Sequence, residues 1–260
     1  MRRRATDPAF ASESRGARTF PGVPEENYWF RRHQAAYELA ARALGAAGTR
    51  RVLDVGCGEG YGPATIPSQQ AHAVELDEAA ARHAARSYPR TRVVRADACA
   101  LPYRAGSFDA VLAMQVLEHL FCADGFLRRV KEILRPGGVL LLSTPNRETF
   151  SSDGEPNPFH VYEYTAEELE ALLRVHFGRV RISGLHHGAM LRAADRAAGG
   201  SFHQYLSSTP FDRLPRRWRA LVRSVRTRHF RVGAPSGSLD LLATAQGDGE
   251  VRGPGRSDQR

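Results

Sequence analysis

Three acidic side chains stand at the ends of three short apolar runs, a placement that suits ligand binding. Asp54 lies near the end of the first run, Glu75 near the end of the second and Asp97 directly after the third. If the runs are parallel strands, their carboxyl ends form one edge of a sheet, where open α/β sheets bind ligands. There the three carboxylates can accept hydrogen bonds from an ammonium group, from two ribose hydroxyls and from an adenine amino group, respectively.

A glycine-rich segment begins two residues after Asp54. Its glycines, Gly56, Gly58 and Gly60, would let the backbone approach a nucleoside closely. The G-x-G-x-x-G pattern of dinucleotide-binding proteins requires glycine at position 61 or 63, where this chain has tyrosine and proline. The sequence therefore argues against a nicotinamide oxidoreductase. It favours a nucleoside ligand that carries a charged amino acid part and no pyrophosphate.

The chain around these acids predicts strands that alternate with helices. We expect helices over residues 25–44, 77–88, 124–134 and 165–175, and strands over 51–55, 71–76, 93–96, 108–114, 139–143, 180–183 and 239–244. Strands of this kind, apolar on both faces, form a mostly parallel sheet with helices on both sides. This α/β, Rossmann-like arrangement would bring the three acids to one edge.

The composition allows one substantial domain, with 260 residues and a hydrophobic content of 42%. We assign it to residues 25–245, between tails over 1–24 and 246–260 whose Arg-, Gly- and Ser-rich composition predicts flexibility. There is no apolar run of 18 residues to span a membrane, and no signal peptide pattern. Cys57, Cys99 and Cys122 are far apart and lack metal-binding spacing, so we expect a reduced, cytoplasmic protein.

The motifs, in their order and spacing, resemble those of class I methyltransferases that take their methyl group from S-adenosylmethionine (SAM). The matching residues are Asp54-x-Gly56-x-Gly58-x-Gly60, Glu75, Asp97-Ala98, Leu101-Pro102, Phe108-Asp109, Glu118-His119 and Leu134 to Gly138. The resemblance implies a seven-stranded sheet with an antiparallel last strand, and SAM as cofactor. It implies SAM contacts from Asp54, Gly56, Gly58, Gly60, Glu75, Leu76, Asp97, Ala98 and Gln115. The chain departs from the family between Pro63 and Ser68, a short segment with two prolines, so the first crossover helix should be stunted.

Other segments resemble the substrate side of small-molecule and sugar methyltransferases. The resemblance is strongest to actinobacterial enzymes that O-methylate the glucose chain of mycofactocin, a peptide-derived redox cofactor. The segments are Glu26 to His33, Thr144 to Asn146, Asn157 to Tyr164, Gly184 to Gly188 and Ser238 to Ala243. This resemblance implies a sugar hydroxyl or another small-molecule hydroxyl as acceptor, with Tyr28, Trp29, Asn157, His186 and His187 beside it.

Transfer to an alcohol needs a base, because an alcohol is a poor nucleophile; a positioned base is typically worth ~10²–10⁴-fold in rate. His160 is the first candidate, since Glu163 can orient it and an imidazole accepts a proton near neutral pH. His119, next to Glu118, is the second. The segment from Gln115 to His119 resembles the metal-binding Glu-x-x-Glu-His of quinone O-methyltransferases. Because Gln115 replaces the first carboxylate, we expect no metal.

The net charge of +9 comes almost entirely from one late segment. Ten arginines face two aspartates between Met190 and Pro235, which gives this segment a charge of +8. It makes up most of an insertion over residues 190–236 that joins the last two strands, and residues 214–226 predict an amphipathic helix within it. We favour a lid over the acceptor. A solvated surface, an oligomer contact or a weak membrane-surface contact are alternatives.

Three other functions stay open at this point. The acceptor can be a quinone or another small metabolite. The basic insertion is compatible with a nucleic-acid methyltransferase, although the chain lacks the Asn-Pro-Pro-Tyr-like or catalytic cysteine motif of base chemistry, and we expect no nucleic-acid partner. A non-catalytic SAM-binding module is the third, which the intact acids and the complete acceptor-side loop argue against.

Overall fold

Strands and helices alternate as expected in a computed structural model, which describes residues 19–45, 49–151 and 157–247. The strands are β1 (Arg51–Val55), β2 (Gln70–Glu75), β3 (Thr91–Arg95), β4 (Phe108–Met114), β5 (Leu134–Pro145), β6 (Arg179–His187), β7 (Phe230–Gly233) and β8 (Asp240–Gln246). The α-helices are α2 (Asn27–Gly45), α3 (Glu78–Ser87), α4 (Ala123–Ile133), α5 (Arg147–Phe150), α6 (Ala166–His176), α7 (Ala189–Ala197), α8 (Phe202–Ser208) and α9 (Arg216–Ser224). Short 3-10 turns connect them: η1 (Pro63–Thr65), η2 (Ala98–Ala100), η3 (Leu117–His119), η4 (Phe211–Arg213) and η5 (Thr227–His229).

The strands form one sheet in the order β3-β2-β1-β4-β5-β8-β6-β7. Strands β1 to β5 pair in parallel, and β8 lies antiparallel between β5 and β6. The mostly parallel sheet and its antiparallel last strand are therefore confirmed. The expected number of seven strands is one too few, because the insertion supplies β7, which pairs antiparallel with β6 at the edge. With only four residues, β7 is too short to show a periodic pattern.

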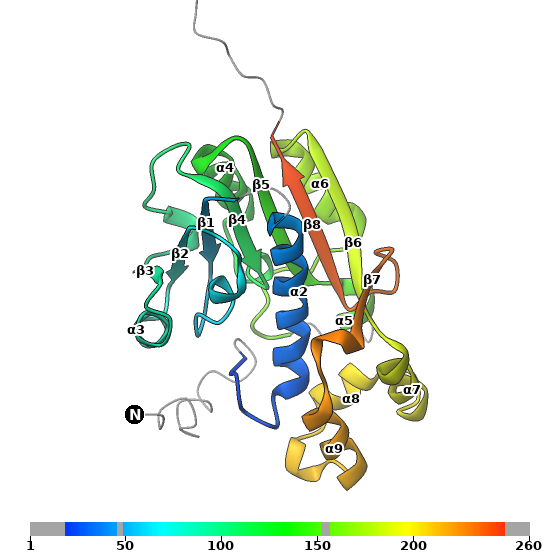
Figure 1. The fold of residues 1–260 in the computed structure, drawn as a ribbon. Helices are drawn as coiled ribbons and strands as arrows, with labels where there is room; N and C mark the ends of the chain where they lie inside the picture. Colours follow the sequence, from blue (N-terminus) through cyan, green and yellow to red (C-terminus); the bar gives the residue numbers. More distant parts are fainter. Residues whose placement is uncertain (1–18, 46–48, 152–156, 248–260) are drawn as a thin grey trace, which may run out of the picture.

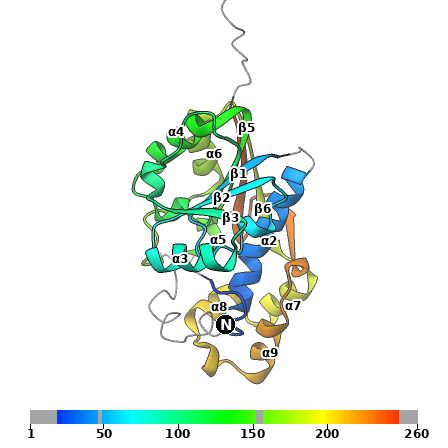
Figure 2. The same cartoon turned by 60° about the vertical axis from the view of Figure 1, so that its left-hand side comes forward.

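Helices cover both faces of the sheet, as expected (Figures 1 and 2). On one face α4 and α6 pack against the central strands, with Phe126, Leu127 and Leu169 completely buried. On the other face α2 contributes a stripe at helical spacing that includes Ala36, Ala40 and Leu44. Burying one leucine or phenylalanine side chain contributes about 1.5–3 kcal/mol. These two apolar layers fix the sheet whose edge carries the acids.

The connection from β1 to β2 contains only the 3-10 turn η1, which confirms the stunted crossover. Pro63 opens this turn, where its missing N–H does no harm. The N-terminal helix α2 fills the space instead, and the Tyr37 ring leaves no room for a side chain at Gly62. Helix α2 therefore forms part of the wall beside the glycine loop.

The insertion gathers α7, α8 and α9 beyond the carboxyl ends of the parallel strands (Figure 1). The expected amphipathic helix is α9, which buries Trp218 and Val222 and exposes most of its arginines. These side chains share a separate apolar cluster with Tyr28 of α2 and Phe202 of α8. The insertion is thus packed against the N-terminal helix.

Two sequence interpretations need correction. Residues 1–18 and 248–260 lie outside the described part of the chain, but Thr19 and Phe20, assigned to the N-terminal tail, are buried, and Gln246 completes β8. Cys99 and Cys122, expected to be unpaired, form a disulfide with a Cα–Cα distance of 6.1 Å. Within the described ranges, each helix is too short or too polar to span a membrane.

Candidate active site

The glycine loop leaves β1 in a conformation that requires glycine. Gly56, Gly58 and Gly60 have φ angles of 70°, 52° and 85°, in the region that side chains disfavour. A Cβ on Gly56 would also lie 2.6 Å from Cγ2 of Val116. The loop therefore exposes bare backbone at the carboxyl edge of the sheet, where a nucleoside can come close.

Asp54 is completely buried at the base of this loop. Its Oδ2 accepts a hydrogen bond from the Tyr37 hydroxyl at 3.0 Å, whereas Oδ1 has no hydrogen-bond partner among the described residues. Burial raises the pKa of Asp54 to about 8. A buried carboxylate oxygen without a partner is costly unless a ligand supplies a donor. An ammonium group beside Oδ1 would satisfy it and favour the charged carboxylate.

Glu75 is held in place by the backbone. Its Oε2 accepts from the N–H of Gly58 at 2.8 Å and its Oε1 from the N–H of Asp77 at 3.0 Å. Each carboxylate oxygen can accept a second hydrogen bond, so both oxygens remain available to a pair of hydroxyls. The next side chain, Leu76, is 62% exposed. Such an apolar surface is suited to contact a flat base.

Asp97 lies on the third strand end, as expected. It caps η2, where its Oδ1 accepts from the N–H of Cys99 at 2.8 Å and its side chain is otherwise exposed. Ala98 begins this turn and packs against the main apolar core. The structure therefore brings the glycine loop, Glu75 and Asp97 to the ends of the adjacent strands β1, β2 and β3.

Gln115 follows β4 with a φ of 58°, the sole positive φ among the described non-glycine residues. A left-handed conformation costs a non-glycine residue about 1–3 kcal/mol and is concentrated at functional sites. The Gln115 amide donates to the Ser143 hydroxyl at 3.2 Å and to Oδ1 of Asp240 at 3.3 Å. The side chain is therefore anchored at the same edge as the acids.

Asp240 also binds Arg32 of α2, a buried pair that the sequence analysis did not single out. The guanidinium donates to both carboxylate oxygens at 2.7 and 2.5 Å and to the Leu239 carbonyl at 2.7 Å. The rings of Trp29 and Phe150 each lie 5.6 Å from its central carbon. The sequence carries one signal of this pair, since Asp240 is an acidic residue within the apolar run that forms β8.

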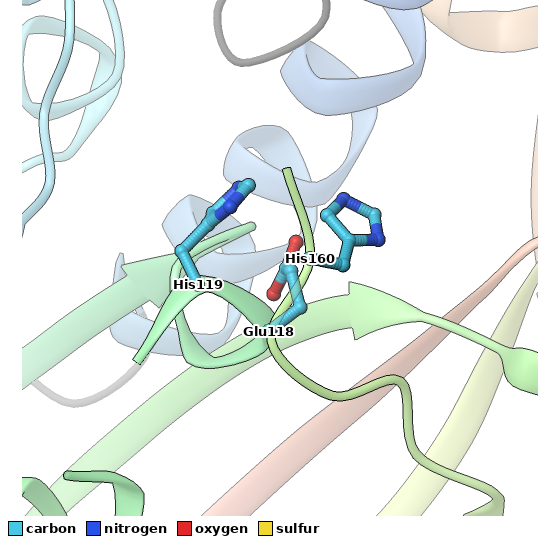
Figure 3. A group of neighbouring side chains, drawn as sticks. All are labelled: Glu118, His119 and His160. Atoms are coloured by element: carbon cyan, nitrogen blue, oxygen red, sulfur yellow. The ribbon is translucent and has the colours of Figure 1, made fainter. Parts of the chain in front are cut away.

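Glu118, His119 and His160 converge close to these residues (Figure 3). One possible ligand atom from each lies within 4.8 Å of the other two. Glu118 and His119 come from η3, and His160 comes from the loop after α5. That loop is seated on η3, because the N–H groups of Val161 and Tyr162 donate to the Glu118 carbonyl at 2.7 and 3.2 Å.

Hydrogen bonds orient both imidazoles. His160 Nδ1 lies 2.6 Å from Oε1 of Glu163, and both side chains are at least 95% buried. His119 Nδ1 lies 2.8 Å from the Phe159 carbonyl. Because a carbonyl only accepts, His119 carries its proton on Nδ1, and the carboxylate of Glu163 favours the same form of His160. Both Nε2 lone pairs are then available for a proton or a metal ion.

The carboxyl groups around the cluster differ in their electrostatics. Burial raises the pKa of Glu118 to about 7, although Thr144 donates a hydrogen bond to it at 2.9 Å. Burial would also raise the pKa of Glu163, but hydrogen bonds from His160 and Ser151 outweigh it, and the pKa is lowered. Glu163 is therefore ionised and suited to stabilise a protonated His160, while the charge of Glu118 depends on what binds beside it.

The other predicted acceptor residues do not join this cluster. The Tyr28 hydroxyl lies 2.7 Å from His187 Nε2, and His187 Nδ1 lies 2.7 Å from Asp195, so the buried Tyr28 and His187 use their polar atoms within this chain of hydrogen bonds. His186 bonds the Ala234 carbonyl at 2.7 Å. Tyr28 and His187 are buried, and Tyr28 packs against the insertion, so their expected contact with the acceptor stays a prediction.

The other two predicted residues are linked to the cluster through neighbouring groups. Asn157 begins the His160 loop and accepts from the N–H of Phe159 at 3.0 Å. Trp29 reaches the site only through Arg32, whose guanidinium it covers. These two remain candidates for acceptor contacts.

The glycine loop and the acids of the neighbouring strand ends form a candidate nucleoside site at the carboxyl edge of the α/β sheet. A family model described as a methyltransferase domain matches residues 53–142. A "Probable S-adenosylmethionine-dependent methyltransferase" of Mycobacterium tuberculosis is 41% identical over 243 residues, which cover 88% of each chain. A similarly named protein of Mycolicibacterium smegmatis is 40% identical, over 88% of this chain and 93% of its own.

The crystal structure of a SAM-dependent methyltransferase from Thermotoga maritima matches with a TM-score of 0.58 at 19% identity, covering 85% of this chain and 93% of that one. This likeness supports the fold. The chain belongs to the SAM-dependent methyltransferases, and SAM is its cofactor. Oδ1 of Asp54, which has no hydrogen-bond partner among the described residues, fits the ammonium group of such a ligand.

Proposed function

We propose that this methyltransferase acts on a hydroxyl group of a sugar or a glycosylated small molecule, the glucose chain of mycofactocin being the favoured acceptor. The observation that supports hydroxyl chemistry is the His160–Glu163 pair, a buried imidazole oriented by an ionised carboxylate. The resemblance of the Asn157 to Tyr164 loop to sugar methyltransferases supports the acceptor class.

The cofactor half of the site follows from the strand ends. Asp54 would receive the ammonium group of SAM, Glu75 the ribose hydroxyls, and Leu76 with Asp97 the adenine. SAM, when bound, supplies a methyl group on a positively charged sulfur. Orienting such a reagent against its acceptor is worth roughly 7–11 kcal/mol of the barrier.

In the acceptor half, His160 takes the proton from the hydroxyl as its oxygen bonds to the methyl carbon. The methyl–sulfur bond breaks at the same time and its electron pair stays on sulfur, so the products are a methyl ether and S-adenosylhomocysteine. Glu163 stabilises the imidazolium that forms, and Glu118 and His119 line the position of the hydroxyl. A base of this kind contributes ~10²–10⁴-fold.

A second mechanism for the same function involves a divalent cation. The convergence of Glu118, His119 and His160 favours it, since each of the three offers a metal ligand. Gln115, which replaces the first carboxylate of the quinone methyltransferase motif, bonds to Asp240 instead, and His160 supplies a third possible ligand from another loop. A bound cation would lower the pKa of the acceptor hydroxyl and would occupy the nitrogen that the base mechanism needs.

Labelled SAM and a cell extract test the proposed acceptor. The label should enter an oligosaccharide or glycoside, and mass spectrometry should place it on an ether oxygen. His160→Ala should lower turnover by roughly 10²-fold or more with SAM affinity within about threefold of the wild type. His176→Ala, whose imidazole pairs with Asp124 on the surface, is the matched control.

The outcomes separate the alternatives. Label on nitrogen or carbon excludes the hydroxyl acceptor, and full activity of His160→Ala excludes the base. If a chelator abolishes turnover and magnesium or manganese restores it, the cation mechanism replaces the base mechanism. Unchanged turnover in the chelator excludes the cation.

A further inference from the structure

A cavity of about 340 Å³ opens between the start of α2 and the segment that joins α8 to α9. Its volume lies within the roughly 300–1,000 Å³ of small-molecule sites. Its wall combines the aromatic rings of Trp29 and Phe211, the aliphatic Leu206 and Leu214, hydroxyls from residues 207–209, and the carboxylate of Glu25. Of the candidate site residues, Trp29 alone is among the residues that line this cavity.

The walls of this cavity are held by contacts that need no ligand. The amide of Asn27, at the start of α2, donates to the carbonyls of Val222 at 2.8 Å and Val225 at 3.1 Å, at the end of α9. Trp218 of α9 packs on Phe202 of α8, with ring centroids 5.1 Å apart. A preformed cavity binds without the entropic cost of ordering its walls.

The cavity is connected to the candidate active site by a row of touching groups. Trp29 forms part of its wall, and the Arg32 guanidinium lies 5.6 Å from the Trp29 ring. The Phe150 ring lies 5.6 Å from the same guanidinium and 5.5 Å from the His160 ring. Both sites lie beyond the carboxyl ends of the parallel strands, the end of the sheet at which Figure 1 shows α8 and α9.

We propose that this cavity binds a neutral saccharide unit of the acceptor, separate from the unit whose hydroxyl is methylated. Aromatic faces such as those of Trp29 and Phe211 can stack on the C–H face of a pyranose. The hydroxyls of Ser207 and Ser208 donate to backbone carbonyls, so they and the Glu25 carboxylate can accept hydrogen bonds from the sugar hydroxyls. The residues that line the cavity include Glu25 and no lysine or arginine, which disfavours a phosphate or carboxylate ligand.

The proposal rests on the proposed function and deepens it, because it assigns a second sugar unit of the acceptor to a particular cavity. It also gives the insertion a role in acceptor binding. The arginines of α9 lie outside the cavity; Arg223, for example, stacks over the Phe211 ring at 5.3 Å and holds it in place.

The test is a titration of the full chain with glucose, maltotriose and cellotriose, read by tryptophan fluorescence. The chain has two tryptophans, so Trp218→Phe isolates the signal of Trp29. At least one trisaccharide should give a saturable change. Phe211→Ala and the cavity-filling Ser208→Phe should each weaken its binding at least tenfold. Phe121→Ala is the matched control, since that ring is 93% exposed and lies outside the cavity.

Three results would overturn the proposal: no saturable response to any of the three sugars, binding that is unchanged in both cavity variants, or tighter binding of glucose 6-phosphate than of the trisaccharides. Methyl transfer assays keep the two proposals apart. If an oligosaccharide is methylated with the same KM in both variants, the cavity assignment fails and the proposed function stands. If sugars bind in the cavity but no hydroxyl is methylated, the cavity assignment stands and the proposed function fails.

Discussion

Replacing Asp240 with leucine should lower the free energy of unfolding by about 3–5 kcal/mol, because it leaves the Arg32 guanidinium charged and buried. The two side chains are only 2% and 1% exposed. The guanidinium loses two of its three hydrogen bonds and keeps the one to the Leu239 carbonyl. Water cannot replace the lost carboxylate at a site enclosed by Trp29 and Phe150.

An exposed ion pair gives the contrasting magnitude. Arg174 and Glu170 bond at 2.6 Å on one face of α6, but their side chains are 52% and 42% exposed. Glu170→Leu should therefore change stability by less than about 1 kcal/mol. The double variant Arg32→Met/Asp240→Leu removes both buried charges and should regain most of the stability that Asp240→Leu loses.

Urea unfolding followed by circular dichroism measures all four proteins. For a chain near 250 residues, each kcal/mol shifts the melting temperature by about 2–4 °C, so Asp240→Leu should melt roughly 10 °C lower. A loss below 1 kcal/mol in Asp240→Leu would show that the buried guanidinium does not depend on its carboxylate partner. So would a double variant less stable than Asp240→Leu, since that result would mean the guanidinium tolerates burial without its partner.

Three further predictions concern the cofactor side. Because burial raises the pKa of Asp54 to about 8, the folded protein without cofactor holds that proton more tightly than the unfolded chain; the resulting stability is present below pH 4 and is lost as pH rises through 8. Urea unfolding of the wild type and of Asp54→Asn at pH 5, 6.5 and 8 tests this. The free energy of unfolding of the wild type should fall relative to that of Asp54→Asn as the pH rises, and a constant difference would contradict the prediction. Gly56 has a φ of 70°, and a Cβ there would lie 2.6 Å from Val116 Cγ2, so Gly56→Ala should lower the free energy of unfolding by about 1–3 kcal/mol. Calorimetry should show SAM binding at least tenfold weaker in this variant. Unchanged SAM affinity would exclude a close approach of SAM to this loop. The disulfide between Cys99 and Cys122 spans 23 residues and should contribute about 3 kcal/mol, so a reductant should lower the melting temperature of the wild type and leave the double serine variant unchanged.

The positions of the candidate cofactor residues could be predicted from the sequence because they depend on the order of residues within short segments of the chain. An acid at the end of a strand and glycines in the following turn occupy positions that the chain direction fixes. The sheet then brings Glu75 and Asp97 to the same edge as Asp54, with no further information needed. The stunted crossover was also predictable, because proline restricts the backbone locally.

The acceptor half depends on contacts between distant parts of the chain. Arg32 and Asp240 are 208 residues apart, and neither shows in the sequence that the other is its partner. The Cys99–Cys122 disulfide was missed for the same reason. Tyr28 and His187 looked like acceptor residues, since an aromatic side chain at helical spacing can face a ligand or a second layer of protein. Only the packing of the insertion decides between the two.

The buried guanidinium of Arg32 lies between the two halves of the site. Through Asp240 it is linked to Gln115, whose backbone is held in a left-handed conformation on the cofactor side. Through the Phe150 ring it is linked to His160 on the acceptor side. Because α2 contributes this group from outside the region matched by the family model, the N-terminal helix adds a buried charge beside both halves of the candidate site. We therefore propose that the acceptor side is built from α2 and the insertion, while the cofactor side is built from the region that the family model matches.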